Sequence, residues 1–251
     1  MKNLPPILTY HKVSTQFEWG LTTISPEKFS RHISILHQSG YEARALGEQS
    51  HNKKPVYLTF DDGYESVYTN AFPIINDIGG KGSVFIISDF IGHSNRWDSN
   101  IGFLTFPHLS VKQIRELSSA DWTIGSHTRS HKCLIGMNEF QLKNELEGSK
   151  KKLEDLIGIA IEYLVPPFGK ADKKIIETAL DCGYKKILLP LTFNRFNYPD
   201  FNCLYRWNMY SKDTDRSFLN RLKTKHFSFQ LTKQMVISFC NNASIAANSI
   251  Q

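Results

Sequence analysis

Short apolar runs rich in β-branched and aromatic residues alternate along the chain with longer stretches whose apolar residues recur every three or four positions. The first pattern is typical of buried strands and the second of amphipathic helices. Strand-like runs cover residues 7–10, 56–60, 82–87, 122–126, 161–165, 185–189 and 204–209. Helical patterns separate most of them, so we expect βα units around a parallel sheet or barrel in an α/β protein.

Several helix ends carry local signals. Ser25 followed by Pro26 predicts an N-cap and a helix that ends before Gly40. Asn138, with Gln141 three residues later, predicts a capping box and the longest helix. Other helices are expected from Ser110 onwards, from Ala171 to Gly183 and from Asp213 to Leu222, and a helical segment through Tyr68 and Phe72 is expected to be disturbed at Pro73.

Composition places the chain among ordinary globular proteins. It has 251 residues, of which 41% are hydrophobic and 22% charged, which excludes disordered, collagen-like and coiled-coil proteins. We expect one catalytic domain over residues 1–225 and a C-terminal extension over residues 226–251 that is partly frayed. The four cysteines, Cys133, Cys182, Cys203 and Cys240, form no C-x-x-C pair and are expected to be reduced thiols.

The charge pattern, the lengths of the apolar runs and the N-terminus indicate which partners and which localisation to expect. Lys and Arg exceed Asp and Glu by six, but no basic stripe is interleaved with aromatic residues, so we expect no nucleic-acid partner. No uncharged apolar run reaches the roughly 18 residues of a membrane-spanning helix, and residues 1–6 do not resemble a signal peptide. These observations predict a cytoplasmic protein without a transmembrane segment.

Polar residues that could take part in catalysis or metal binding follow several predicted strands. His11 follows the first strand, Asp61 and Asp62 follow the second, and His127 and His131 follow a later one. Parallel strands bring their carboxyl ends to one face, so these side chains are expected to share a rim. Taken alone, Asp61-Asp62-Gly63 is more typical of a turn, and an isolated H-x-x-x-H is more often a coincidence than a ligand pair.

Together these residues predict a metal-assisted hydrolase. If residues 127–131 were helical, His127 and His131 would lie on one face and could bind one cation. Two histidines and one carboxylate form a ligand set that leaves positions open for water and substrate. The second aspartate would then be available as a base that accepts a proton from water.

At these residues the sequence resembles the polysaccharide deacetylase family, the NodB-type carbohydrate esterases. Thr59-Phe60-Asp61-Asp62-Gly63 is similar to the family's first signature, and residues 127–131 are similar to its second, H-[ST]-x-x-H. The resemblance implies a distorted (β/α) barrel of the polysaccharide deacetylase type in a single domain. It also implies that Asp61 is the general base and that Asp62, His127 and His131 bind the metal.

Two positions depart from the family pattern. Residues 165–169 end like the third signature, but Val165 stands where the family often has an arginine, and we expect Arg206 to act as a substitute. The chain has no counterpart of the family's late histidine in an apolar strand. Instead, Tyr10-His11 resembles a subset of the family with an N-terminal Tyr-His motif, which implies that His11 is the general acid; a histidine that only caps the first strand is the alternative.

Substrate contacts are predicted from the third signature and from aromatic residues. Pro166, Pro167, Phe168 and Gly169 are expected to form one wall of the groove, with Arg206 also counted among the substrate-binding residues. Trp97, Phe168 and Trp207 are candidates for stacking on a sugar ring, although each could instead be a core residue.

These inferences lead to one expected function and two alternatives. We expect hydrolysis of an acetyl group, N-acetyl before O-acetyl, from a polysaccharide, an oligosaccharide or a glycan precursor. One divalent metal is expected, zinc first and cobalt, nickel or manganese as alternatives. The alternatives are a metal-dependent amide hydrolase acting on a non-sugar substrate and a non-catalytic carbohydrate-binding protein of the same fold.

Overall fold

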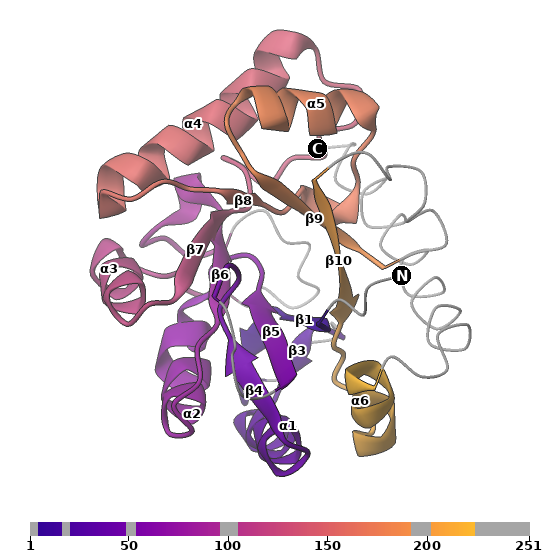
Figure 1. Cartoon of the computed structure of the whole chain (residues 1–251). Helices are drawn as coiled ribbons and strands as arrows, with labels where there is room; N and C mark the ends of the chain where they lie inside the picture. Colours follow the sequence, from indigo (N-terminus) through magenta and orange to yellow (C-terminus); the bar gives the residue numbers. More distant parts are fainter. Residues whose placement is uncertain (1–4, 17–20, 49–53, 96–104, 192–201, 224–251) are drawn as a thin grey trace.

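The computed structural model describes residues 5–16, 21–48, 54–95, 105–191 and 202–223, and Figure 1 shows how its elements are arranged. The strands are β1 Ile7–Tyr10, β2 Lys12–Val13, β3 Thr23–Ile24, β4 Tyr41–Arg44, β5 Lys54–Phe60, β6 Ser83–Ile86, β7 Thr123–Ser126, β8 Tyr163–Leu164, β9 Lys186–Pro190 and β10 Cys203–Asn208. The helices are α1 Pro26–Gln38, α2 Phe72–Asn76, α3 Val111–Ser119, α4 Glu139–Ile157, α5 Lys173–Asp181 and α6 Asp215–Leu222. Short helical turns are η1 Val67–Ala71, η2 Ser88–Phe90 and η3 Pro167–Gly169.

The main sheet closes on itself. Its strand order is β1-β10-β9-β8-β7-β6-β5-β4, and β1 also pairs with β5. Within the described residues, β1 and β5 to β10 therefore form a ring of seven strands, all parallel to their neighbours, while β4 attaches to the first half of β5. Helices α1 to α5 lie outside this ring in Figure 1, so the predicted distorted (β/α) barrel is confirmed.

Side chains alternate between the two faces of each strand. Those that point outward pack with the helices in a large core cluster, which includes Phe60, Ile124 and Leu164. Those of Ile7, Phe85 and Leu188 point inward and form a second, smaller cluster with Leu46 and Val165, which lie just after β4 and β8. The interior is tight at one point, because a Cβ on Gly125 would lie 2.4 Å from the ring of Phe85. The barrel interior is therefore a packed apolar core beneath the carboxyl ends of the strands.

Most helix signals in the sequence are confirmed. Ser25 caps α1, and capping boxes formed by Ser110 with Gln113 and by Asn138 with Gln141 begin α3 and α4. The helical segment through Tyr68 and Phe72 is irregular next to Pro73, as expected. The π-helical turn η1 runs without a break into α2, and Pro73, which has no N–H to donate, lies in the first turn of α2.

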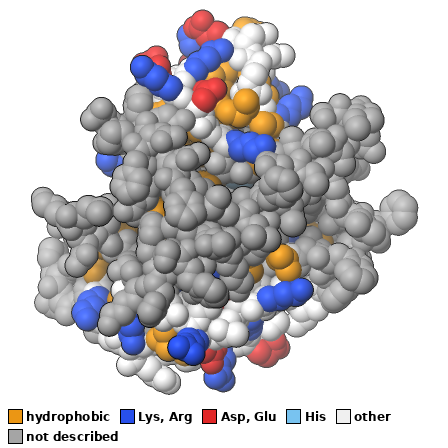
Figure 2. Space-filling model, turned by 90° about the vertical axis from the view of Figure 1, so that its right-hand side faces the viewer, with side chains coloured by type: hydrophobic (Ala, Val, Ile, Leu, Met, Phe, Trp, Pro, Cys, Tyr) orange, Lys and Arg blue, Asp and Glu red, His pale blue; other side chains and the backbone are white. Residues whose placement is uncertain are grey.

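The remaining expectations concern the number of strands, membrane-spanning helices, the cysteines and the surface charge. The strands β2, β3 and β4 are additional to those predicted. Among the described helices, none is long and apolar enough to cross a membrane. Cys133, Cys182 and Cys203 are free thiols, whereas Cys240, Trp97 and the extension at 226–251 lie outside the described residues. On the face drawn in Figure 2, acidic and basic side chains are interspersed at the margins.

A buried histidine connects α1 to α6. His32 has no exposed surface, its ring stacks on Phe218 at 4.4 Å, and its Nδ1 lies 3.1 Å from the hydroxyl of Tyr10. Burial, with a smaller contribution from the charge of Lys28, lowers the pKa of His32 from 6.5 to about 4. The imidazole is therefore neutral in the folded protein at neutral pH.

We expect His32 to make the fold sensitive to acid. Between pH 6.5 and pH 4 the unfolded chain binds a proton that the folded protein does not, so stability is present above pH 6.5 and is lost as the pH falls towards 4. This single group should cost roughly 2 kcal/mol of unfolding free energy at pH 5. Urea unfolding at pH 7 and pH 5 checks this, because the fall should be smaller by that amount in His32→Leu. An equal fall in both proteins would contradict it.

Candidate active site

The site lies at the carboxyl ends of the barrel strands. Strand β1 ends before His11 and β5 ends before Asp61, and the two strands pair directly. The N–H of Asp61 donates to the carbonyl oxygen of Tyr10 at 2.9 Å, so the pairing continues to the residues that carry the chemistry. His127 follows β7, and Arg206 lies on β10, the other neighbour of β1.

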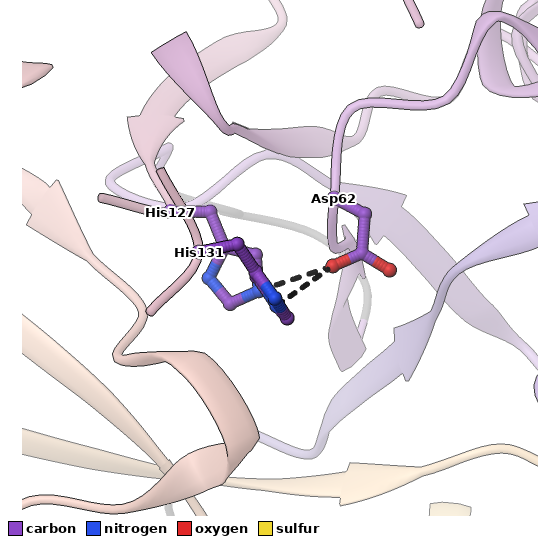
Figure 3. A group of neighbouring side chains, drawn as sticks. All are labelled: Asp62, His127 and His131. Atoms are coloured by element: carbon purple, nitrogen blue, oxygen red, sulfur yellow. Dashed lines mark ion pairs between the residues drawn. The ribbon is translucent and has the colours of Figure 1, made fainter. Parts of the chain in front are cut away.

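Three of the predicted residues converge as a donor group. Nε2 of His127 lies 3.2 Å and Nε2 of His131 lies 3.5 Å from Oδ1 of Asp62 (Figure 3). One donor atom from each residue falls within 4.8 Å of the others, and all three residues are buried. One carboxylate and two imidazoles are a donor set that suits zinc and similar divalent ions.

The orientation of His127 also fits a metal. Its Nδ1 lies 2.7 Å from the carbonyl oxygen of Val165, which can only accept, so Nδ1 carries the proton and donates. Nε2 therefore faces Asp62 and His131 as the ligand nitrogen, an arrangement common among metal-binding histidines. The residues present fit a divalent ion held by Asp62, His127 and His131.

The carboxylate and the two imidazoles shift one another's pKa values. Burial alone would raise the pKa of Asp62, but the hydrogen bond from His127 and the nearby histidines hold it far below its usual value. Burial alone would lower the pKa of His127, yet Asp62 and Asp61 raise it above 6.5. Burial and the neighbouring His127 lower the pKa of His131 to about 3. The proton shared between His127 and Asp62 is the one that a bound cation would replace.

The turn between the histidines is not helical, so the helical condition under which they would lie on one face is not met. Thr128 and His131 have φ values of 66° and 60°, in the left-handed region. The Nε2 atoms of His127 and His131 lie close together because the turn reverses the direction of the chain, not because the two residues are one helical turn apart. Each such non-glycine residue costs of order 1–3 kcal/mol and persists only where the surroundings impose it.

Asp61 does not belong to the donor group and has its own partner. Both terminal nitrogens of Arg206 donate to its carboxylate, Nη1 to Oδ1 and Nη2 to Oδ2, each at 2.6 Å. Burial alone would raise the pKa of Asp61, but the charge of Arg206 lowers it below its usual value. Asp61 is thus an ionised buried carboxylate held in one orientation by a bidentate guanidinium.

The placement of Arg206 differs from its predicted role in substrate binding, and Val165, which stands where the family often has an arginine, is a core residue. Arg206 is only 3% exposed and its fork is occupied by Asp61, so it is positioned to act on that carboxylate and not on a substrate. The side chain of Val165 has no exposed surface and packs in the barrel interior. The guanidinium beside Asp61 comes from β10, two strands away from Val165.

His11 is the more exposed partner of Asp61. Its Nε2 lies 3.9 Å from Oδ2 of Asp61, and its side chain is 20% exposed against 6% for that of Asp61. Within the described residues, Nδ1 of His11 has no hydrogen-bond partner. His11 is therefore the more solvent-accessible of these two groups.

The other predicted substrate contacts differ in their placement. Phe168 is half-buried, and its ring lies 4.9 Å from that of His131, while Pro166 and Pro167 are buried beneath it. Gly169 has a φ of 64°, and a Cβ there would lie 2.6 Å from the ring of Pro190, which explains a glycine at this point of the wall. Trp207 is 5% exposed and belongs to the core cluster, which matches the core alternative for this residue.

Sequence reasoning missed a buried carboxylate next to the donor group. Glu145 on α4 accepts hydrogen bonds from the backbone N–H groups of Arg129 and Ser130. A signal was available, because Glu145 lies on the same helix face as Leu142 and Ser149, where an apolar residue is expected.

Comparison with known proteins agrees with this geometry. The family profile described as Polysaccharide deacetylase matches residues 48–187, which include Asp61, Asp62, His127 and His131. The chain belongs to the polysaccharide deacetylase family. The chain is 31% identical over 189 residues to YxkH of Bacillus subtilis, whose name assigns it to the same family; the match covers 72% of the chain and 62% of YxkH.

Other relatives are more distant. The peptidoglycan-N-acetylmuramic acid deacetylase PdaA of Bacillus subtilis is 27% identical over 158 residues, which cover 61% of this chain and 52% of PdaA. The chain thus spans less than two thirds of the length of these curated relatives.

Solved structures share the fold. A polysaccharide deacetylase from Bacillus cereus superimposes with a TM-score of 0.71 at 22% identity, covering 86% of this chain and 68% of that one. A Streptococcus pyogenes deacetylase, solved in complex with acetate, has a TM-score of 0.72 at 19% identity and covers 87% of this chain and 97% of that one.

We expect the purified protein to bind about one equivalent of zinc, because three converging donors leave room for a single ion. The double variant His127→Ala, His131→Ala should lose it, and His37→Ala, a change at an exposed histidine of α1, should not. Elemental analysis after zinc loading and desalting checks this. Zinc at a hundredfold excess over its Kd should also stabilise the wild type by about 2.7 kcal/mol. Retention of the metal by the double variant would contradict the assignment.

Proposed function

We propose that this protein is a metal-dependent hydrolase that removes an acetyl group, N-acetyl in the first place, from a glycan or a glycan precursor. The observation that carries the proposal is the arrangement at one rim of the barrel. An ionised Asp61, fixed by Arg206, lies next to a buried Asp62, His127 and His131 group in a chain of the polysaccharide deacetylase family.

Asp62, His127 and His131 would hold the metal. A divalent ion bound there would act as a Lewis acid on the acetyl carbonyl and would make a neighbouring water more acidic. Because both imidazoles are held with Nε2 towards Asp62, the protein offers a preformed set of ligands.

Asp61 is suited to be the general base. Its carboxylate is ionised, so it can accept a proton from water as the oxygen attacks the acetyl carbon. The fork of Arg206 prevents the carboxylate from rotating, so the accepting oxygen keeps a constant direction.

His11 is suited to be the general acid. It contacts Asp61 and is the group of this cluster nearest to solvent, where a leaving amine would depart. As the carbon–nitrogen bond breaks, the departing nitrogen needs a proton, and an imidazolium at His11 can supply it.

The relatives support an amino-sugar substrate without selecting one. By their names, PdaA acts on peptidoglycan N-acetylmuramic acid, and a Staphylococcus aureus relative, 27% identical over 161 residues, acts on poly-β-1,6-N-acetyl-D-glucosamine. The feature common to these substrates is an N-acetylated hexosamine. We therefore propose an N-acetylhexosamine unit as the substrate class.

Replacing Asp61 by Asn should lower kcat by about 10²–10⁴-fold, the usual contribution of a general base, while leaving metal content unchanged. Acetate release from an N-acetylglucosamine oligomer by the zinc-loaded protein measures this. Asp155→Asn, a matched change on the exposed face of α4, is the control and should keep full activity.

The same assay separates the alternatives. Acetate release from an O-acetylated oligosaccharide alone would favour an O-acetyl substrate over an N-acetyl substrate. Turnover of a cyclic imide alone would favour the amide hydrolase. Zinc and sugar binding without any turnover would favour the carbohydrate-binding protein.

Arg206→Gln should move the acid limb of the pH profile of kcat/KM to higher pH. The charge of Arg206 lowers the pKa of Asp61, so its loss raises that pKa, and the base then becomes protonated at a higher pH. Arg115→Gln, at an exposed position of α3, should leave the profile unchanged. An acid limb at the same pH in the folded Arg206 variant would contradict this role.

A further inference from the structure

Helix α4 places an acidic side chain under the turn that carries the two histidines. Glu145 is only 7% exposed, and within the described residues it forms no ion pair. A buried carboxylate needs several hydrogen-bond donors to be tolerated. The hydrogen-bond donors to Glu145 therefore indicate the role of this carboxylate.

Among the described residues, all donors to Glu145 come from the turn between His127 and His131. The N–H of Arg129 donates to Oε2 at 3.1 Å and the N–H of Ser130 donates to the same oxygen at 2.9 Å. The hydroxyl of Ser130 donates to Oε1. Both carboxylate oxygens are thus used to hold the two middle residues of the turn.

The turn needs such an external anchor. Thr128 and His131, on either side of the two residues that Glu145 holds, have left-handed backbone conformations, and Thr is β-branched, for which this conformation is a genuine outlier. A second contact restrains the start of the turn, where the N–H of Thr128 donates to Oγ of Ser126 at 3.1 Å, and that hydroxyl lies 2.9 Å from Oγ of Ser149 on α4. Helix α4 therefore fixes the turn at two points.

The conformation matters because it determines where the His131 ring points. His127 is oriented by its own hydrogen bond to Val165, whereas His131 comes at the end of the strained turn. If residues 129 and 130 moved, Nε2 of His131 would leave its position 3.5 Å from Asp62.

We propose that Glu145 is a positioning residue whose carboxylate holds the turn at residues 128–131 so that His131 and His127 present Nε2 to the same cation. The inference rests on the proposed function, because it takes Asp62, His127 and His131 as the metal ligands. Glu145 acts through the backbone of the turn and does not touch the ion.

Glu145→Leu is the sharpest test. Leu keeps most of the volume of the side chain but has no acceptor atom, so it loses the bonds from both backbone N–H groups and from the hydroxyl of Ser130. Glu147→Leu makes the same chemical change two residues later, at an exposed position of α4. The measurement is the zinc Kd of each full-length protein, by competition with a chromogenic chelator, together with the Tm of the zinc-free form.

The expected result is a zinc Kd raised by about 10–100-fold in Glu145→Leu, the range found when groups behind metal ligands are altered, and unchanged in Glu147→Leu. A role in stability alone would lower the Tm of the zinc-free form and leave the Kd of the folded protein as in the wild type. That result would overturn the proposal while leaving the proposed function intact. A wild type that binds no zinc would overturn both.

Ser130→Ala keeps the proposal testable if Glu145→Leu does not fold. It removes one hydrogen bond to Glu145 and leaves the charge and both backbone bonds in place. We expect a zinc Kd raised by about three- to tenfold, which corresponds to one moderate hydrogen bond. Ser118→Ala on α3, outside the site, is the matched control and should bind zinc as the wild type does. Equal Kd values for the two serine variants would count against Glu145.

Discussion

Strand β1 pairs with β5 from Ile7 opposite Tyr57 to Tyr10 opposite Phe60, and this pairing closes the barrel. The rest of the site depends on it, because the register brings His11 and Asp61 side by side at the ends of two strands nearly fifty residues apart in sequence. It also brings β10, the other neighbour of β1, close enough for Arg206 to reach Asp61. A shift of one residue would turn these side chains away from the barrel interior.

The site is an arrangement of charges that balance in pairs. Arg206 neutralises Asp61, and His127 neutralises Asp62, so each of the two aspartates has a cationic partner of its own. The two aspartates are adjacent in sequence, yet their environments differ: one faces a permanent guanidinium and the other faces ligand nitrogens. This difference separates a residue suited to accept a proton from one suited to bind a cation.

The barrel strands and helix α4 both position the side chains of the site. The strands supply Asp61, His127 and Arg206 at their ends, and the packed apolar interior below them leaves these groups little freedom. Residues that lie beyond the strand ends need support from outside the barrel. Helix α4 provides it for the turn leading to His131, through Glu145 and Ser149.

The sequence by itself determined the alternation of strands and helices, because apolar periodicity and capping residues such as Ser25 and Asn138 are local signals. It also pointed to Asp61, Asp62, His127 and His131, whose spacing forms recognisable motifs. Only the tertiary structure decided that Arg206 pairs with Asp61, that the 127–131 turn is not helical, and that Glu145 holds it. Those contacts join residues on separate elements, and their partners are chosen by barrel closure and strand register, which no local pattern encodes.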